Sequence, residues 1–273
     1  MRVSCRLAHP PGAYSAVRTE SKMRLINPRE RSRERSAIHR ATIRRCRIGY
    51  LLCFAAALGL IAAPVVQAES AETLRIYLVR HGETDWNTES RVQGGTDTEL
   101  NATARQQAAE LAARFKGVRF DAVYSSALKR SRDTAELLRG PVPLTSLAGL
   151  NDRRQGKFEG QRIDGSDPAS AAEYKSRSAD PKDSLDGGES LDQFSERIRA
   201  AIALIRNQRP TGVVLIVGHF ITNQMILRTL LNLTSEQARS ISQSNDEVYM
   251  IEMESDHPPR LWKLISEKNL SDL

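Results

Sequence analysis

The chain has few cysteines, and none of them lies in its long C-terminal part. Cys5, Cys46 and Cys53 all belong to the N-terminal segment. No internal disulfide can therefore form after that segment, and the rest of the chain would not mispair its thiols in an oxidising compartment. An internal repeat and a proline-rich linker are also absent. The roughly 205 residues from position 69 onward are thus expected to form one domain with its own core.

Residue patterns that mark other common sites are missing as well. The chain has no glycine-rich loop followed by lysine and serine or threonine, the sequence that cradles the phosphates of nucleoside triphosphates. This absence argues against a nucleoside-triphosphate site. Only three of the five histidines lie after residue 68, and one of them, His257, stands in a proline-rich segment that predicts an exposed turn.

The net charge of +7 conceals two parts of opposite sign. Residues 1–68 hold 13 Lys and Arg against 3 Asp and Glu, whereas residues 69–273 hold 27 against 30. The excess of basic residues therefore belongs to the N-terminal segment, and the C-terminal part is slightly acidic. This distribution gives no reason to expect a nucleic-acid partner.

The N-terminal segment has the pattern of an export signal. Arg44, Arg45 and Arg47 precede the apolar stretch 48–66, and Val66-Gln67-Ala68 resembles a small-residue cleavage site. We predict export to the periplasm or the outside after cleavage near Ala68. The apolar stretch is close to the lower length limit of a membrane span, so an uncleaved anchor at 48–66 is the alternative. The remainder of this leader, the Arg- and Ser-rich residues 1–40, lacks apolar periodicity and is expected to be disordered.

After residue 73, strands and helices are expected to alternate along the chain. Apolar and β-branched runs predict strands, and apolar residues three or four apart predict helices. Ser190 and Gln193 form a capping box that marks the start of one helix. Strands are expected at 74–80, 122–125, 142–147, 213–218, 247–253 and 260–265, and helices at 101–115, 127–138, 191–205 and 221–232.

This alternation predicts an α/β fold, a three-layer α/β/α sandwich with a mainly parallel central sheet and a few antiparallel edge strands. The last two strands, joined through His257-Pro258-Pro259, are expected to form a closing hairpin. Residues 151–189 are polar and rich in Gly, Ser and Asp, which predicts a loop or a small helical lid over the strand ends. The domain then spans residues 69–273.

Two of the predicted strands end in a histidine. Leu78-Val79 runs into Arg80-His81-Gly82, and Val213–Val217 runs into Gly218-His219. Because open α/β sheets place their chemistry at the carboxyl ends of the strands, the two histidines are expected to share one site.

The polar residues near these strand ends suit an anion. The guanidinium fork of Arg80 matches phosphate oxygens, and Arg130, at the start of a helix after the second strand, can point over the same edge. Asn87 can donate an amide hydrogen, and His219 can supply another donor. A neutral His81 has a ring nitrogen that can attack phosphorus and form a phosphohistidine.

At this point the chain resembles the histidine phosphatase (phosphoglycerate mutase-like) superfamily over nearly all of residues 74–266. Four blocks carry the resemblance, in the order of the family: Arg80-His81-Gly82-Glu83-Thr84-Asp85-Trp86-Asn87, Arg91-Val92-Gln93-Gly94, Ser125-Ser126-Ala127-Leu128-Lys129-Arg130 and Gly218-His219. The resemblance implies that His81 is the phosphorylated histidine and that Gln93 and Gly94 line the substrate pocket.

The family's acid/base carboxylate is a further implied residue. Leu150-Asn151-Asp152-Arg153-Arg154-Gln155-Gly156 resembles the segment that carries it, with Asp152 where the family usually has glutamate. The shorter side chain must lie closer to the substrate or act through a water. Glu83 and Glu159 are alternative carboxylates, although the resemblance implies that the first belongs to the signature and that the second is structural.

The resemblance implies a mechanism without a metal or a cofactor. A phosphomonoester, either a small molecule or a phosphoprotein, binds with its phosphate among Arg80, Asn87, Arg130 and His219. His81 attacks the phosphorus while Asp152 protonates the leaving oxygen. Asp152 then deprotonates the water that hydrolyses the phosphohistidine.

Three functions agree with this signature. Gly187-Gly188-Glu189-Ser190-Leu191, after a short lid, is similar to the phosphatase branch, whose lid lacks the basic insertion of the mutases. An exported enzyme would also be separated from glycolytic intermediates. These features favour a phosphatase over a phosphoglycerate mutase. The third alternative, a non-catalytic phosphate-binding module, is favoured only by the change to Asp152, since the histidine and arginine pairs are intact.

Overall fold

A computed structural model of the chain describes residues 73–264. The predicted leader, its apolar stretch 48–66 and the cleavage site near Ala68 lie outside the described residues, as does Ile265 at the end of the last predicted strand. Within residues 73–264, none of the helices has the length and apolar character needed to cross a membrane.

The described strands form one sheet in the order β3-β2-β4-β1-β5-β6. The first four strands in this order run parallel, whereas β5 pairs antiparallel with β1, and β6 antiparallel with β5. Their bounds are β1 Leu74–Arg80, β2 Ala122–Ser126, β3 Leu144–Leu147, β4 Gly212–Gly218, β5 Val248–Glu254 and β6 His257–Leu264. The predicted sheet, mainly parallel with antiparallel strands at one edge, is confirmed.

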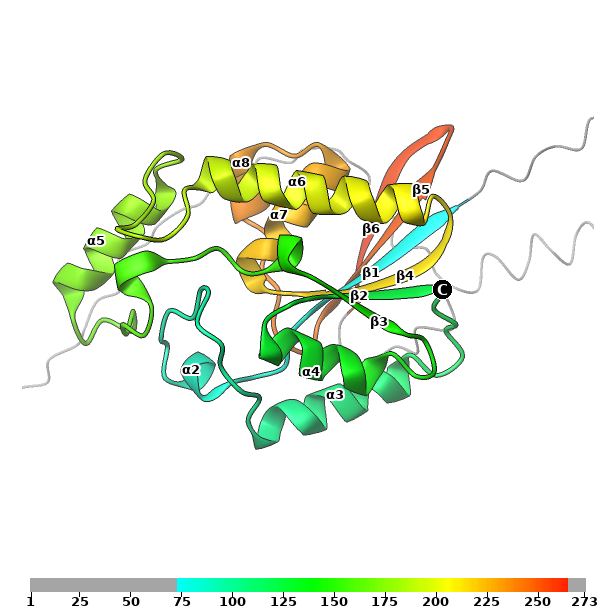
Figure 1. Cartoon of the computed structure of the whole chain (residues 1–273), viewed down its shortest axis with the longest axis horizontal. Helices are drawn as coiled ribbons and strands as arrows, with labels where there is room; N and C mark the ends of the chain where they lie inside the picture. Colours follow the sequence, from blue (N-terminus) through cyan, green and yellow to red (C-terminus); the bar gives the residue numbers. More distant parts are fainter. Residues whose placement is uncertain (1–72, 265–273) are drawn as a thin grey trace, which may run out of the picture. The chain divides into compact units, whose positions relative to one another are not determined.

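Helices cover both faces of this sheet (Figure 1). On one face lie α3 (Ala102–Arg114) and α4 (Lys129–Leu138), and on the other α6 (Leu191–Gln208) and α7 (Phe220–Leu231). The three-layer sandwich is therefore confirmed. The shorter elements are α2 Asp85–Thr88, α5 Pro168–Ala179, α8 Ser235–Arg239 and the 3-10 turns η1 Ala148–Leu150 and η2 Gly156–Phe158.

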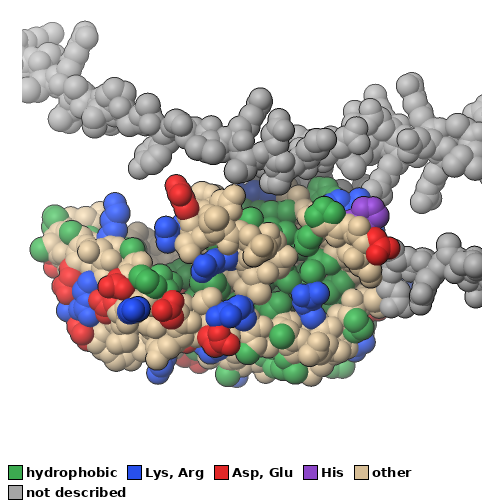
Figure 2. Space-filling view, turned by 90° about the horizontal axis from the view of Figure 1, so that it is seen from above, with side chains coloured by type: hydrophobic (Ala, Val, Ile, Leu, Met, Phe, Trp, Pro, Cys, Tyr) green, Lys and Arg blue, Asp and Glu red, His purple; other side chains and the backbone are tan. Residues whose placement is uncertain are grey.

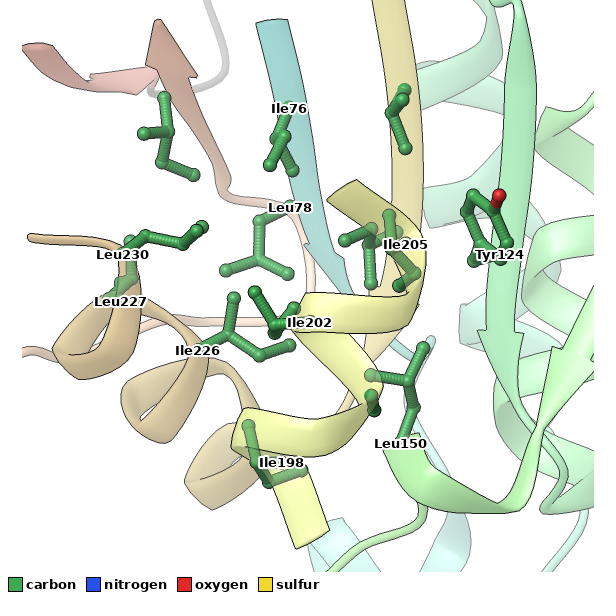
Figure 3. Packing of buried hydrophobic residues seen from close by; sticks show 14 of the residues in the cluster. Ile76, Leu78, Tyr124, Leu150, Ile198, Ile202, Ile205, Ile226, Leu227 and Leu230 are labelled. Atoms are coloured by element: carbon green, nitrogen blue, oxygen red, sulfur yellow. The ribbon is translucent and has the colours of Figure 1, made fainter. Parts of the chain in front are cut away.

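Side-chain alternation along the strands divides the core into two apolar layers. In β1, Leu74, Ile76 and Leu78 pack with α6 and α7 (Figure 3). Tyr77 and Val79 point to the opposite face and pack with α3 and α4. Burial of each such side chain stabilises the fold by about 1.5–3 kcal/mol. Because helices cover both faces of the strand, nearly all of its side chains are buried, and its sequence is therefore a near-continuous apolar run.

The predicted start of α6 is confirmed by its capping box. The Ser190 hydroxyl accepts a hydrogen bond from the Gln193 backbone N–H at 3.2 Å, and the Gln193 side chain accepts one from the Ser190 N–H at 3.1 Å. These two bonds satisfy backbone donors that a helix start leaves open. Five apolar residues at helical spacing predict its inner face: Phe194, Ile198, Ile202 and Ile205 are buried, whereas Leu191 at the helix start is only half-buried.

The predicted hairpin exists, but its turn was wrongly placed. Ser255 and Asp256 form the turn, and His257-Pro258-Pro259 opens strand β6. Prolines are tolerated there because β6 is an edge strand, so its outward N–H positions need no partner. Two short helices were also missed. Both α2 and α8 are too short to show apolar periodicity, and both begin with capping boxes.

The segment predicted as a lid contains η2 and the helix α5. Arg153, which is 1% exposed, donates hydrogen bonds to the backbone carbonyls of Ser178 at 2.7 Å and Asp183 at 3.1 Å. Acidic and basic side chains crowd the outer surface at the α5 end of the molecule (Figure 2). Among them, Arg177 bonds both Asp183 and Asp186. Residues 151–189 are thus held together by a buried arginine and by exposed ion pairs, and their role as a lid remains a prediction.

Candidate active site

The two histidines lie together because strands β1 and β4 end in register. Arg80 pairs with Gly218 in the parallel ladder, and the His81 N–H donates to the Gly218 carbonyl at 2.9 Å. The next residue on each strand is a histidine. The rings of His81 and His219 have their centroids 5.1 Å apart, with 55° between their planes, and the residues are 2% and 0% exposed. The predicted meeting of the two histidines is therefore observed.

The backbone selects the tautomer of His81. Its Nδ1 lies 2.8 Å from the Gly82 carbonyl oxygen, which can only accept a hydrogen bond, so Nδ1 carries the proton. Nε2 then has a free lone pair. Burial, reinforced by the charges of Arg130 and Arg80, lowers the pKa of His81 well below its ordinary value of 6.5. The ring is therefore neutral and has one nitrogen suited to nucleophilic attack.

Arg80 is held at the end of β1 by a loop that comes much later in the sequence. Its Nη1 donates to the backbone carbonyl of Gln243 at 3.1 Å, and its guanidinium carbon lies 5.5 Å from the centre of the Phe220 ring. Burial lowers the pKa of Arg80, and the charge of Asp152 opposes this effect. An arginine remains protonated under such conditions, so the cation is retained.

Arg130 is fully buried and is fixed by two carbonyls of the loop before α3. It donates from Nη1 to Thr96 O at 2.7 Å and from Nη2 to Gly94 O at 2.8 Å. Gly94 has a φ of 54°, and a Cβ at this position would lie 2.5 Å from the Glu159 Oε1. Only a glycine fits at this position, where the backbone carbonyl accepts the hydrogen bond from Arg130.

Asp152 faces Arg130 with one carboxylate oxygen. Its Oδ2 lies 3.7 Å from Arg130 Nη2, while its Oδ1 accepts hydrogen bonds from the Arg153 N–H at 3.1 Å and from the Thr222 hydroxyl at 3.4 Å. The side chain is 13% exposed. Burial raises the pKa of Asp152, and Arg130 is the strongest opposing influence. A raised pKa suits a carboxyl group that must deliver a proton.

The two alternative carboxylates have structural partners. Glu83 accepts a hydrogen bond from the Asn101 side chain at 2.9 Å, at the start of α3. Glu159 accepts bonds from the N–H groups of Gly95 at 2.8 Å and Gln155 at 2.9 Å, and from the Thr96 hydroxyl at 2.6 Å. These bonds hold loops together, whereas Asp152 lies beside Arg130.

Buried nitrogen atoms beside His81 have no hydrogen-bond partner among residues 73–264. They are the Nε–H donors of Arg80 and Arg130 and the two ring nitrogens of His219, of which one carries a proton. Burial is the main reason that the pKa of His219 lies well below its ordinary value of 6.5, so this ring is neutral and carries one N–H. Unpaired buried donors are costly, and a bound anion would satisfy them. The arrangement therefore forms a site for a phosphate-like group, with the start of helix α7 at Phe220 adding a positive dipole end.

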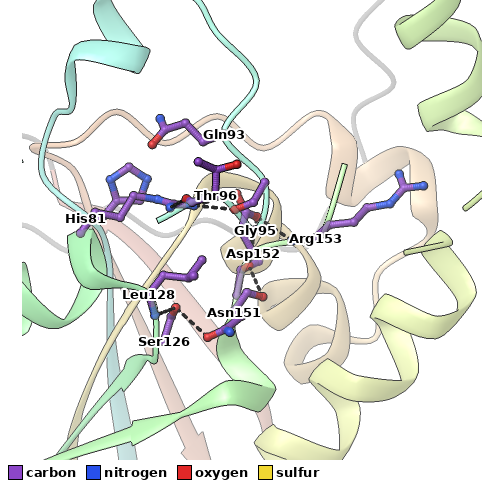
Figure 4. A network of polar contacts seen from close by, with 12 residues as sticks. His81, Gln93, Gly95, Thr96, Ser126, Leu128, Asn151, Asp152 and Arg153 are labelled. Atoms are coloured by element: carbon purple, nitrogen blue, oxygen red, sulfur yellow. Dashed lines mark hydrogen bonds and ion pairs between the residues drawn. The ribbon is translucent and has the colours of Figure 1, made fainter. Parts of the chain in front are cut away.

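Of the two remaining predicted binding residues, Asn87 lies in helix α2 and Gln93 in the loop that follows it. The side-chain oxygen of Asn87 accepts bonds from the Thr84 N–H and hydroxyl, both at 3.1 Å, which leaves the amide nitrogen as its donor group. Gln93 is 8% exposed, and its side-chain oxygen accepts a bond from the Thr98 hydroxyl at 2.7 Å. Figure 4 shows Gln93 and His81 above the segment that carries Asp152, with Arg153 directed away from His81.

Several polar residues that support the site were missed in the sequence. Asn223 donates to the Val79 carbonyl at 3.1 Å and to the Gln243 side chain at 2.8 Å, and Asn245 donates to the His81 carbonyl at 2.6 Å. Asn223 had a signal, because it is a polar residue on the buried face of an apolar helix. The loop residues had none, since they lie in a polar stretch.

Metal ions in proteins are bound by groups of side chains that lie close together. Within residues 73–264, no three His, Cys, Asp or Glu side chains come together in a way that could hold a metal ion. The predicted independence from metals remains a prediction.

The chain belongs to the histidine phosphatase superfamily (branch 1), whose sequence model matches residues 76–264. The match covers β1 through β6 and therefore includes both histidines, both arginines and Asp152. Members of this superfamily are enzymes, either phosphatases or mutases.

Similar proteins of both kinds are found. A probable phosphoglycerate mutase GpmB from Shigella boydii serotype 18 is 32% identical over 195 residues, which is 69% of this chain and 87% of that protein. The structure of a putative alpha-ribazole-5'-P phosphatase from Escherichia coli K-12 superposes with a TM-score of 0.64 at 25% identity, over 71% of this chain and 97% of that one. A mycobacterial glucosyl-3-phosphoglycerate phosphatase gives a TM-score of 0.60 at 26% identity, over 69% and 97%.

Proposed function

We propose that the chain is a phosphomonoester hydrolase that works through a phosphohistidine on His81. One observation carries this proposal: the Nε atoms of Arg80 and Arg130 and the ring nitrogens of His219 are buried, lie beside a neutral histidine ring and have no hydrogen-bond partner within residues 73–264. A phosphate group would satisfy these donors and would present its phosphorus to the ring. Its substrate is a small-molecule or protein phosphomonoester.

In the first step, Nε2 of His81 attacks the phosphorus and the bond from phosphorus to the ester oxygen breaks. The leaving oxygen takes a proton from Asp152, which we assign to Oδ2, because Oδ1 already accepts two hydrogen bonds. Arg80, Arg130 and His219 stabilise the charge on the transferring group.

In the second step, a water attacks the phosphorus and its proton passes to the Asp152 carboxylate. The bond from phosphorus to Nε2 breaks. Since Nδ1 keeps its proton on the Gly82 carbonyl, the phosphorylated ring carries a positive charge and is a good leaving group. Phosphate and the original protonation states are then restored.

The test combines turnover with detection of the intermediate. The full chain is incubated with a panel of phosphomonoesters, without added metal and with a chelator, and samples are quenched in alkali to detect acid-labile phosphate on His81. We expect phosphate release and trapped phosphohistidine in the wild type, and neither in His81→Ala. Activity that a chelator abolishes and a divalent ion restores would instead indicate a metallophosphatase. Binding of phosphate without release or trapping would indicate a non-catalytic module.

A phosphoglycerate mutase is the second candidate, favoured by the similarity to the probable phosphoglycerate mutase GpmB. Both reactions share the phosphohistidine and differ in which hydroxyl accepts the phosphoryl group. The short lid and the sequence Gly187-Gly188-Glu189-Ser190-Leu191 support the hydrolase. Transfer between phosphoglycerates that is faster than phosphate release would decide for the mutase.

We also propose that the enzyme is exported. Three features support this proposal: the basic residues Arg44, Arg45 and Arg47, the apolar stretch 48–66 and the cleavage-like end at Ala68. The N-terminal residue of the protein purified from its source tests it: a start at Glu69 indicates cleavage, an intact chain in the membrane fraction indicates an anchor at 48–66, and an intact chain in the cytosol contradicts export.

A further inference from the structure

Arg197 of helix α6 contacts the backbone of the segment that carries Asp152. Its Nη1 donates to the carbonyls of Ala148 at 3.3 Å, Gly149 at 3.0 Å and Asn151 at 3.0 Å, and its Nη2 lies 3.3 Å from the carbonyl of Asp152 itself. One guanidinium thus contacts four of the five backbone carbonyls from Ala148 to Asp152.

The guanidinium is itself held rigidly. Glu189 accepts from Arg197 Nε at 2.9 Å and from Nη2 at 2.6 Å, and Glu189 is 6% exposed. The Phe194 ring, which is fully buried, lies with its centre 5.1 Å from the Arg197 guanidinium carbon. A two-point carboxylate contact and a packed aromatic face restrict the rotation of the arginine.

The same segment is tied down from two further directions. Asn151 accepts bonds at its side-chain oxygen from the Ser126 hydroxyl at 3.1 Å and the Ala127 N–H at 2.8 Å (Figure 4). At Gly149 a Cβ would lie 2.9 Å from the Cβ of Ala201, so the backbone can approach α6 closely only because this residue is a glycine. The segment is therefore clamped between β2 and α6.

This clamp matters because the carboxylate is on a short side chain. Aspartate has a single methylene between its backbone and its carboxylate, so the position of the Asp152 backbone largely decides where Oδ2 lies. A shift of the backbone passes directly to the group that must transfer a proton, and a misplacement of 1 Å can cost about 100-fold in rate.

We propose that Arg197, held by Glu189, is a positioning residue for Asp152 and thereby sets how well the enzyme cleaves esters with poor leaving groups. The inference rests on the proposed function, in which Asp152 protonates the leaving oxygen. An alkoxide needs that proton, whereas nitrophenolate departs without it. Loss of the Arg197 contacts should therefore slow the cleavage of alkyl phosphates and leave the cleavage of 4-nitrophenyl phosphate unchanged.

The experiment measures kcat/KM, which reports on phosphorylation of His81, for an alkyl phosphate and for 4-nitrophenyl phosphate. The full chain is compared with Arg197→Met, Arg197→Lys, Asp152→Asn and a matched control, Arg199→Met. Arg199 lies on the same helix, is 56% exposed and pairs with Glu196 on the surface. Arg197→Lys keeps a positive charge near Glu189 but cannot span four carbonyls.

We expect Asp152→Asn to lose about 10²- to 10⁴-fold with the alkyl ester and little with the nitrophenyl ester. Both Arg197 variants should show the same selectivity, with a loss of about 10- to 100-fold for the alkyl ester. Arg199→Met should change neither value. The ratio of the two kcat/KM values does not depend on the fraction of folded enzyme, so a poorly folding Arg197→Met remains informative.

The outcomes separate the two proposals. If Asp152→Asn is selective and the Arg197 variants lower both substrates equally, or neither, the positioning role is wrong while the proposed function stands. If Asp152→Asn itself shows no selectivity, Asp152 is not the acid, and both the proposed mechanism and the inference fail.

Discussion

The two buried histidines should make the stability of the fold depend on pH. Both rings have a pKa well below 6.5 in the folded protein, mainly because they are buried and lie near Arg130. In the unfolded chain each titrates near its ordinary value. Below about pH 6.5, His81 and His219 therefore bind two protons in the unfolded chain that they do not bind in the folded protein. Acidification thus favours unfolding.

The size of the effect follows from linkage. Each histidine that stays neutral in the fold lowers the free energy of unfolding by about 1.4 kcal/mol for every pH unit below 6.5, until the pKa of the folded state is reached. The pair then contributes about 2.7 kcal/mol per unit, a large share of the 5–15 kcal/mol that is typical of a domain. The effect of Asp152 on stability has the opposite sign, because burial raises the pKa of this carboxyl group in the folded protein. Its contribution to the free energy of unfolding is therefore lost as pH rises from the ordinary pKa of aspartate to the raised pKa of the folded state.

Denaturant unfolding between about pH 7.5 and 5.5 would measure this dependence. In His219→Gln one of the two protons is removed, so the decline below pH 6.5 should be shallower than in the wild type by about 1.4 kcal/mol per unit. His257→Gln is the matched control, because that side chain is 66% exposed and outside the site. Parallel curves for the wild type and His219→Gln would refute the claim that burial keeps this ring neutral.

Three further predictions concern the site and its frame. A Cβ on Gly82 would lie 2.8 Å from the Cβ of Ala104, so Gly82→Ala should lower the free energy of unfolding by about 1–3 kcal/mol. Adding Ala104→Gly should recover much of this loss. If the effects of the two substitutions were strictly additive, a steric clash between the two side chains would be ruled out. Inorganic phosphate at 100 times its Kd should stabilise the wild type by about 2.7 kcal/mol, seen as a rise in Tm, and Arg130→Met should show no such rise. With an alkyl phosphate, kcat/KM should fall as pH rises through the raised pKa of Asp152, because only the protonated form is an acid; the same fall with 4-nitrophenyl phosphate would assign it to another group.

Much of the fold could be predicted because its main elements have strong local signals. Strands β1 and β4 are covered on both faces and therefore read as continuous apolar runs, and α6 combines a capping box with an apolar stripe. The elements that escaped prediction are short. Helix α2 has four residues and rests on the exchange of hydrogen bonds between Thr84 and Asn87, which leaves no periodic pattern to recognise.

The supporting residues of the site could not be predicted in the same way. Gln243 and Asn245 reach Arg80 and His81 across sequence separations of 163 and 164 residues. Nothing in their neighbourhood in the chain distinguishes them from other polar loop residues. Arg197 likewise looks like a surface arginine on an amphipathic helix until the packing of η1 against α6 brings four carbonyls to it.

The sequence by itself determined which groups are present for chemistry: two histidines and an arginine at strand ends, a second arginine at a helix start, and an aspartate in the lid segment. It also determined the family. Only the tertiary structure decided that His81 bears its proton on Nδ1, that His219 is neutral and that Asp152 turns Oδ2 toward Arg130. Proton positions depend on burial and on partners brought from distant parts of the chain, and neither exists until the chain has folded.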